Sequence, residues 1–364
     1  MQKTSAWPLA LSWFGLIAYA SLYPFVDWRD QGIAPWAFLT APFPKYWTGF
    51  DVGANILGYV PAGFLLALTA SRTGRGRNAI VRSAMVCAAL SLCMETLQTY
   101  LPARVPSNVD FGLNVLGGWL GAASAYLLER GGALDRWSRI RSRWFVADAS
   151  GALVLLALWP VALLFPSAVP LGLGQVMERL EAAMVDLLAD TPFLEWMPMR
   201  ELELQPLVAG AEFLCVMLGA LVPCLLGYCI IRSRLRRMVF SVAVVALGVV
   251  TTGLSAALTY GPQHAWGWIH PAILAGLAVA LALALGLAML PRRASAALAL
   301  LGLGVYLSLL NQAPADPYFA LTLQTWEQGR FIRFHGLAQW LGWLWPYVVV
   351  VYLVTHIWRQ DREN

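Results

Sequence analysis

Ten apolar stretches of roughly 18–24 residues run through this 364-residue chain, and each can cross a hydrocarbon layer about 30 Å thick. Inside lipid a segment must satisfy its backbone N–H and C=O groups internally, which a helix does. We therefore predict an all-α, polytopic transmembrane helix bundle of about ten spans. The stretches cover approximately residues 7–25, 53–70, 79–101, 110–128, 149–169, 207–231, 238–258, 269–290, 295–312 and 337–357.

The composition supports a membrane protein. Hydrophobic residues make up 59% of the chain and charged residues 12%, with a mean hydropathy of +0.63. A soluble domain carries about 25% charged residues, so this chain falls outside the ordinary soluble class.

The arginines and lysines predict the orientation. One alternating set of loops and tails holds 18 of the 25 basic residues, namely Lys3, Arg72, Arg75, Arg77, Arg82, Arg130, Arg136, Arg139, Arg141, Arg143, Arg232, Arg234, Arg236, Arg237, Arg292, Arg293, Arg359 and Arg362. The positive-inside rule then places both termini in the cytoplasm. The net charge of +5 is explained by this topology, so we expect no nucleic-acid binding. We expect a multi-pass protein of the inner (cytoplasmic) membrane.

An eleven-residue pattern occurs twice, each time where a predicted span begins. Both copies read Ser/Thr-x-x-Asp-x-Gly-x-Asn-Ile/Val-Leu-Gly, from Thr48 to Gly58 and from Ser107 to Gly117. In each copy Asp and Asn are four residues apart and share one helix face. Polar groups inside a membrane are costly and usually functional.

Each copy also has a purely local explanation. Thr48 and Ser107 can cap a helix, with Asp51 and Asp110 as reciprocal capping-box partners. That leaves Asn55 and Asn114 unexplained. It also leaves the glycines of the pattern, Gly53 and Gly112, which we expect to admit another backbone. Below Asn114, Gly117 and Gly121 have the spacing of close helix packing. Asparagines that only join helices remain an equally weighted alternative.

The third span adds a polar face of its own, formed by Ser91, Glu95 and Gln98. A buried carboxylate needs a partner or becomes protonated. Arg104, in the stiff loop between Pro102 and Pro106, is the nearest cation in sequence, and we expect it to neutralise Glu95 or one of the aspartates. The expected ligand-binding residues are Asp51, Asn55, Glu95, Gln98, Arg104, Ser107, Asp110 and Asn114. A buried ion-pair network that only fixes the bundle is the alternative.

The duplication also predicts how the chain is organised. Residues 1–128 would form a four-span unit of two parallel hairpin repeats, and 129–148 a basic cytoplasmic linker. Residues 149–364 would form a six-span region with an extracytoplasmic loop at 170–206. Helical spacing at 175–189 predicts an amphipathic helix in that loop. Near the last span, Arg330 and Arg333 are secondary candidates for binding a phosphate, although interfacial anchoring is the more favoured explanation.

The ordered motif resembles the VanZ-like family. It runs Asp51-x-x-x-Asn55, Pro61-x-Gly63, Glu95-x-x-Gln98, and Arg104-x-x-Ser107-x-x-Asp110-x-x-x-Asn114-x-x-Gly117-x-x-x-Gly121, within residues 10–128. The resemblance implies an integral membrane protein of the cell envelope with its signature residues in the outer half of a four-span unit. The family's named member accompanies glycopeptide resistance. The six further spans mean that this role cannot simply be carried over.

Three functions follow as hypotheses. The first is a non-enzymatic binder of an envelope lipid, a lipid-linked glycan or a wall precursor at the outer leaflet, with envelope-biosynthesis proteins as possible partners. The second is a transporter or flippase of an envelope lipid with Glu95 as a proton-coupled site. The third is an intramembrane transferase or hydrolase that uses paired carboxylates, alone or with a metal. No nucleophile with an adjacent base is evident, so we favour a binder, with no cofactor and no resident metal.

Overall fold

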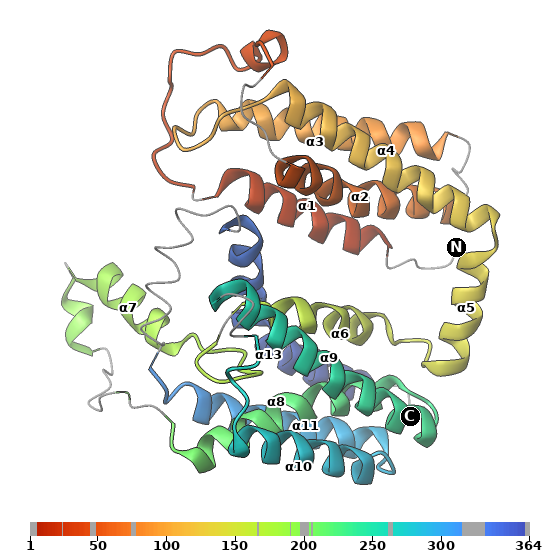
Figure 1. The fold of residues 1–364 in the computed structure, drawn as a ribbon, viewed down its shortest axis with the longest axis vertical. Helices are drawn as coiled ribbons and strands as arrows, with labels where there is room; N and C mark the ends of the chain where they lie inside the picture. The colour runs from red at the N-terminus through yellow and green to blue at the C-terminus, as the bar shows by residue number, and fades with distance from the viewer. Residues whose placement is uncertain are drawn as a thin grey trace. The chain divides into compact units, whose positions relative to one another are not determined.

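The structure is a computed structural model that describes residues 6–23, 25–43, 49–73, 78–165, 167–189, 191–196, 204, 207–260, 265–314 and 332–360. These residues form helices and connecting loops, and within them the only extended pairing is an isolated bridge between Phe145 and Ile231. The predicted all-α class is confirmed (Figure 1).

Every predicted span coincides with an apolar helix. These helices are α1 (Ala6–Leu22), α2 (Gly49–Arg72), α3 (Ala79–Gln98), α4 (Asn108–Arg130), α6 (Ser150–Ala162), α8 (Ala209–Ile230), α9 (Arg234–Tyr260), α10 (Pro271–Leu287), α11 (Arg292–Leu310) and α13 (Ile332–Gln360). Among the described residues seven of them are long and apolar enough to cross a membrane, whereas α1, α6 and α10 are shorter. The count of ten crossings and the cytoplasmic termini stay predictions.

Helix α6 differs most from its predicted span, because it ends at Ala162 rather than near residue 169. Pro166 and Pro170 follow in the sequence, and the residue before a proline is disfavoured in the α conformation. The described residues in the second part of the predicted span, 163–165 and 167–169, are therefore irregular backbone.

The chain divides into two compact units, unit 1 (Met1–Ile140) and unit 2 (Arg141–Asn364). Helix α5 (Ala133–Trp144) contains the boundary, so much of the segment predicted as a linker is helical. Each unit is described by itself below.

Unit 1 is built on an extremely close contact between α2 and α4. A Cβ atom added at Gly63 would collide with the carbonyl of Gly118, one at Gly117 with the carbonyl of Ile56, and one at Gly121 with the carbonyl of Val60. Residue numbers rise together in the last two pairs, so α2 and α4 run parallel. Small residues that let two backbones touch are typical of membrane helices.

Two glycines of the repeated pattern, Gly53 and Gly112, differ from the role expected of them, whereas Gly117 packs against the backbone of α2 as described above. A Cβ at Gly53 or Gly112 would meet nothing within 4 Å, so the expectation that these two admit another backbone is wrong. Gly63 and Gly118, outside the repeated pattern, make close contacts instead. The rotation of each helix about its axis selects which glycines face the partner.

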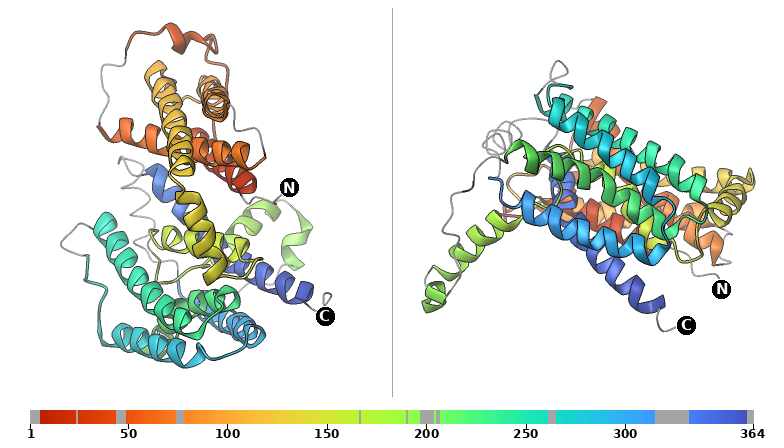
Figure 2. Two further views of the ribbon diagram at one scale, coloured as in Figure 1. Left: turned by 90° about the vertical axis from the view of Figure 1, so that its right-hand side faces the viewer. Right: turned by 90° about the horizontal axis from the view of Figure 1, so that it is seen from below.

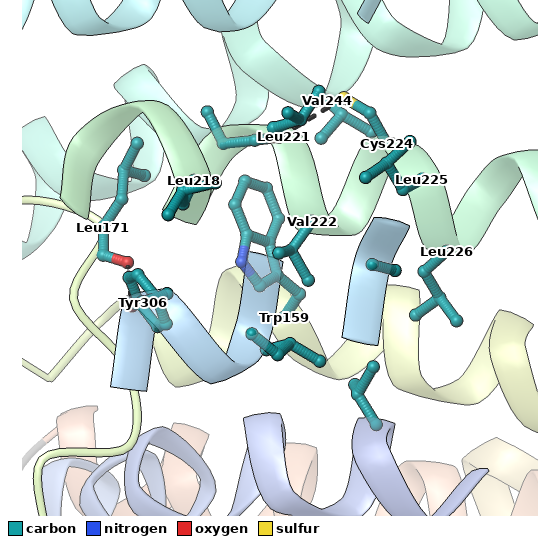
Figure 3. Packing of buried hydrophobic residues seen from close by; sticks show 14 of the residues in the cluster. Trp159, Leu171, Leu218, Leu221, Val222, Cys224, Leu225, Leu226, Val244 and Tyr306 are labelled. Atoms are coloured by element: carbon teal, nitrogen blue, oxygen red, sulfur yellow. Dashed lines mark hydrogen bonds between the residues drawn. The ribbon is translucent and has the colours of Figure 1, made fainter. Parts of the chain in front are cut away.

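In unit 2, α8 is the central helix, and α6, α9, α10 and α11 pack against it (Figures 1 and 2). Every residue from Cys215 to Ile230 except Met217 is buried. Figure 3 shows the indole ring of Trp159 lying among the α8 side chains Leu218, Leu221 and Val222. Helix α13 packs along α6 and α11 and completes the unit.

A buried irregular loop at residues 169–176 follows α6. Asn311 holds the end of this loop: its Oδ1 accepts hydrogen bonds from the Val176 and Met177 amides at 3.0 Å, and its Nδ2 donates to the Gly174 carbonyl at 3.1 Å. Tyr306 Oη accepts from the Leu173 amide and donates to the Leu171 carbonyl. Irregular backbone can be buried where protein groups satisfy its N–H and C=O groups in this way.

The predicted amphipathic helix is confirmed as α7 (Met177–Leu188). Its exposed apolar side chains Leu180, Met184 and Leu187 recur at helical spacing on one face. A short 3₁₀ helix, η2 (Pro192–Trp196), follows. That α7 lies on the outer membrane surface stays a prediction.

Candidate functional site

Ser107 begins α4 as its N-cap. Its hydroxyl accepts hydrogen bonds from the amides of Val109 at 3.2 Å and Asp110 at 3.4 Å, as predicted. The Ser107 amide donates to a side chain of α3, Glu95 Oε2, at 2.9 Å. The capping-box role expected for Asp110 stays a prediction. Thr48, the corresponding cap in the first copy, lies outside the described residues.

Asp110 instead joins α4 to α2. Its Oδ1 accepts a hydrogen bond from Asn55 Nδ2 at 2.7 Å, and both side chains belong to half-buried residues. The bond therefore connects the acid of one copy of the pattern to the amide of the other. Asp51 lies one turn before Asn55, in the exposed first turn of α2.

Helix α3 contributes two buried polar side chains to the same end of unit 1. Glu95 is 4% exposed and Gln98 is 7% exposed. Gln98 Nε2 donates to the Ser21 carbonyl at 2.9 Å, which ties α3 to the end of α1. Glu95 connects α3 to α4 through its bond to Ser107, so α1, α2, α3 and α4 are joined through polar side chains at one end of unit 1.

Arg104 binds carbonyl groups at the end of α1. Its Nε donates to the Tyr23 carbonyl at 2.9 Å, and a terminal nitrogen donates to the carbonyls of Tyr23 and Ala20. A cation is favourable there, because the last carbonyls of a helix lack partners within the helix. The expected neutralisation of Glu95 or an aspartate by Arg104 stays a prediction.

Asn114 lies one turn deeper than Asp110 and is 5% exposed. Its Nδ2 donates to the Ser91 hydroxyl at 3.0 Å, and Ser91 is fully buried. Tyr59, 4% exposed, lies close to Ser91 and within electrostatic range of Glu95. Sequence reasoning missed Tyr59, although its position four residues after Asn55 marks the same helix face.

The structure thus gathers most of the predicted residues at one end of unit 1. Bonds within this end involve Asn55, Glu95, Gln98, Arg104, Ser107, Asp110 and Asn114. The secondary candidates cannot be placed with them: Arg330 and the side chain of Arg333 lie outside the described residues. Within the described part of the chain, no cluster of three or more His, Cys, Asp or Glu side chains is arranged to hold a metal ion.

The contacts define what this end can do chemically. Carboxylates supply hydrogen-bond acceptors, amides supply donors and acceptors, and Arg104 supplies a cation. Such a mixture suits a ligand with several polar groups, and three helices offer side chains to it.

Comparison with protein families shows that residues 5–129 match the VanZ/LLP1 family. The matched segment includes α1, α2, α3 and all but the last residue of α4, and therefore every residue of the polar end described above. Comparison with curated proteins found no match, and neither did comparison with solved structures. The resemblance inferred from the sequence is confirmed for residues 5–129, which match the VanZ/LLP1 family, and seven helices among the described residues are long and apolar enough to cross a membrane.

Proposed function

We propose that the protein lies in the cytoplasmic membrane of the cell envelope, where unit 1 binds the head group of a membrane lipid or of a lipid-linked glycan or wall precursor at the outer leaflet. The observation that carries the proposal is the meeting of polar side chains from α2, α3 and α4 at one end of unit 1. Polar groups are costly within a membrane and are usually kept for function.

Burial increases stepwise through this group of residues. Asp51 is exposed, Asn55 and Asp110 are half-buried, and Glu95 and Asn114 are buried. A head group that enters beside Asp51 would replace its hydrogen bonds to water with hydrogen bonds to protein side chains, first at the exposed residue and then at the more buried ones. Preorganised partners of this kind lower the entropic cost of binding.

The proposed ligand-binding residues are not equivalent. Arg104 already donates from Nε and from a terminal nitrogen to carbonyls of the α1 end, which favours a role in holding α1 over a role as the main phosphate contact. The acids and amides would therefore provide most of the recognition, through hydrogen bonds to hydroxyl or amino groups.

Photo-crosslinking tests this function directly. The full chain in lipid nanodiscs is incubated with a diazirine-bearing polyprenyl-linked saccharide, irradiated, and digested for peptide mapping. We expect saturable labelling in α2 or α4 that an unlabelled analogue displaces. Asp110→Ala should weaken labelling by about tenfold, because a charged hydrogen-bonding group contributes roughly 1.5–3 kcal/mol.

The matched control is Asp186→Ala, which removes an exposed carboxylate on α7 in unit 2. It should label as the unsubstituted chain does. Labelling that does not saturate, or that is the same with and without Asp110, would contradict the proposed function.

A further inference from the structure

Beneath the polar end of unit 1 lies a second layer of polar side chains, which we call the inner tier: Tyr59, Ser91 and Asn114. Each lies one helix turn deeper than a residue of the outer group, namely Asn55, Glu95 and Asp110 respectively. We infer that the inner tier, together with Glu95, receives an O–H or N–H donor group of the ligand and disfavours a bare phosphate. This inference rests on the proposed function and specifies the class of its ligand.

Two buried oxygen atoms of the inner tier carry the inference. Among the described residues, Asn114 Oδ1 and Tyr59 Oη have no hydrogen-bond partner, although both residues are at least nine-tenths buried. The Ser91 hydroxyl lies near Tyr59, but their geometry does not make a hydrogen bond. A buried polar atom without a partner destabilises the folded state, and a suitable ligand group would supply the missing hydrogen bond.

The chemistry of the surrounding atoms selects what can bind there. Asn114 Oδ1 is a carbonyl oxygen and can only accept a hydrogen bond, and the Nδ2 of the same amide, which donates to Ser91, identifies which atom is the oxygen. Glu95 adds carboxylate oxygens, which are acceptors when ionised and attract a cation. Asn114 Oδ1, the Tyr59 hydroxyl and the Glu95 carboxylate can each accept a hydrogen bond from a ligand, and an ionised carboxylate repels an anion. A hydroxyl or ammonium group would satisfy them, whereas a phosphate brings further acceptors and negative charge.

A buried polar atom without a partner is not by itself a binding site, and a donor in unit 2 is an example. Trp159 Nε1 also lacks a partner among the described residues, but its ring lies among the apolar side chains Leu218, Leu221 and Val222 (Figure 3). The inner tier differs because polar groups from α2, α3 and α4 gather in one layer.

A resident buried water is the competing explanation, since such waters bond to otherwise unsatisfied groups and are costly to remove. The Tyr59→Phe variant separates the two explanations. If Tyr59 Oη serves a ligand, the variant keeps or gains thermal stability without ligand and loses affinity. If Oη anchors a structural water, the variant loses stability and keeps its affinity, which would overturn the inference.

Native mass spectrometry of the full chain, titrated with defined lipids, measures the affinity. Phosphatidylethanolamine presents an ammonium group, phosphatidylglycerol and a polyprenyl-linked saccharide present hydroxyl groups, and phosphatidic acid presents phosphate alone. We expect donor-bearing lipids to be retained over phosphatidic acid. Tyr59→Phe should reduce that retention about fivefold to tenfold, equivalent to one hydrogen bond. Comparison of the retention of the ammonium-bearing lipid with that of the hydroxyl-bearing lipids shows which kind of donor group the inner tier prefers.

Tyr306→Phe is the matched control, because it removes a buried tyrosine hydroxyl in unit 2 that has protein partners. It should leave lipid retention unchanged. Equal retention of phosphatidic acid and the donor-bearing lipids would overturn the inference. The inference would also be overturned if Tyr59→Phe left lipid affinity unchanged while Asp110→Ala abolished photo-crosslinking. In that case the proposed function would still stand. If the unsubstituted chain bound none of the lipids saturably, both the further inference and the proposed function would be contradicted.

Discussion

Two regions of this protein bring polar groups into apolar surroundings, and they do so differently. In the buried loop of unit 2, residues 169–176, Asn311 uses both ends of its amide and Tyr306 both accepts and donates. In the inner tier of unit 1, Tyr59 Oη and Asn114 Oδ1 have no partner among the described residues. A fully satisfied network fixes a structure, whereas a partly satisfied one loses stability. We attribute the difference to function: the loop serves the fold, and the inner tier is the part of unit 1 that we propose serves a ligand.

The largest predicted effect tests the packing that brings the tier together. In Gly121→Leu the new side chain would collide with the Val60 carbonyl and force α2 away from α4. We expect a loss of about 3 kcal/mol or more, and the polar end would separate with it. Thermal unfolding in detergent, followed by tryptophan fluorescence, measures the loss.

Gly112→Ala is the control for this variant, since a Cβ there would meet nothing within 4 Å. It should be neutral or gain up to about 1 kcal/mol, because alanine is the better helix former. Equal destabilisation by both variants would show that the α2–α4 contact is not what holds unit 1 together.

Substitution of one asparagine in each region, Asn311 in the loop and Asn114 in the inner tier, compares how much each region contributes to stability. Asn311→Ala would leave the amides of Val176 and Met177 and the carbonyl of Gly174 without the partner that Asn311 provides. We expect a loss of about 2–4 kcal/mol, whereas Asn114→Ala, which breaks one described bond, should lose about 1 kcal/mol. Chemical denaturation of both variants in the same detergent tests the order, and similar losses would remove the distinction between the regions.

The two buried tyrosines give a smaller contrast of the same kind. Tyr306→Phe should lower stability by about 1–3 kcal/mol, since it leaves the Leu173 amide and the Leu171 carbonyl without the tyrosine hydroxyl. Tyr59→Phe should leave the free energy of unfolding unchanged or raise it slightly. Melting temperatures of the two variants, measured without added lipid, check this. The reverse order would make Tyr59 the structural tyrosine.

The smallest effect concerns the bond between the two copies of the pattern. A double-mutant cycle with Asn55→Ala and Asp110→Ala should give a coupling of about 0.6–1.7 kcal/mol, as for other hydrogen bonds between membrane helices. The control cycle pairs Asn55→Ala with Thr69→Ala, fourteen residues away on α2, or about 21 Å. That pair should show coupling near zero. A negligible value for Asn55 with Asp110 would mean that their bond contributes nothing to unit 1.

Much of the fold could be predicted from hydropathy. Apolar stretches long enough to cross a bilayer marked all the apolar helices, because helices are the structures that satisfy the backbone in lipid. The early end of α6 could not be read in this way. The segment after Ala162 stays apolar in sequence but is held in irregular form by partners such as Tyr306 and Asn311, more than 130 residues later.

The candidate site was predictable in its members but not in their partners. Helical spacing placed the Asp and Asn of each copy on one helix face, and the structure shows that these faces of α2 and α4 meet through Asn55 and Asp110. It could not show that Glu95 would bind the Ser107 amide, or that Arg104 would bind the end of α1, because both contacts depend on how helices pack. Tyr59 went unnoticed since a tyrosine in an apolar helix resembles ordinary core.

The bond between Asn55 and Asp110 has a consequence for how the protein is made. Its two partners are 55 residues apart in the chain. At 5–20 residues per second, the ribosome needs about 3–11 s to extend the chain from the first to the second. During that interval α2 would wait beside the insertion machinery with its amide unmatched. Assembly of unit 1 would therefore be completed only when α4 arrives.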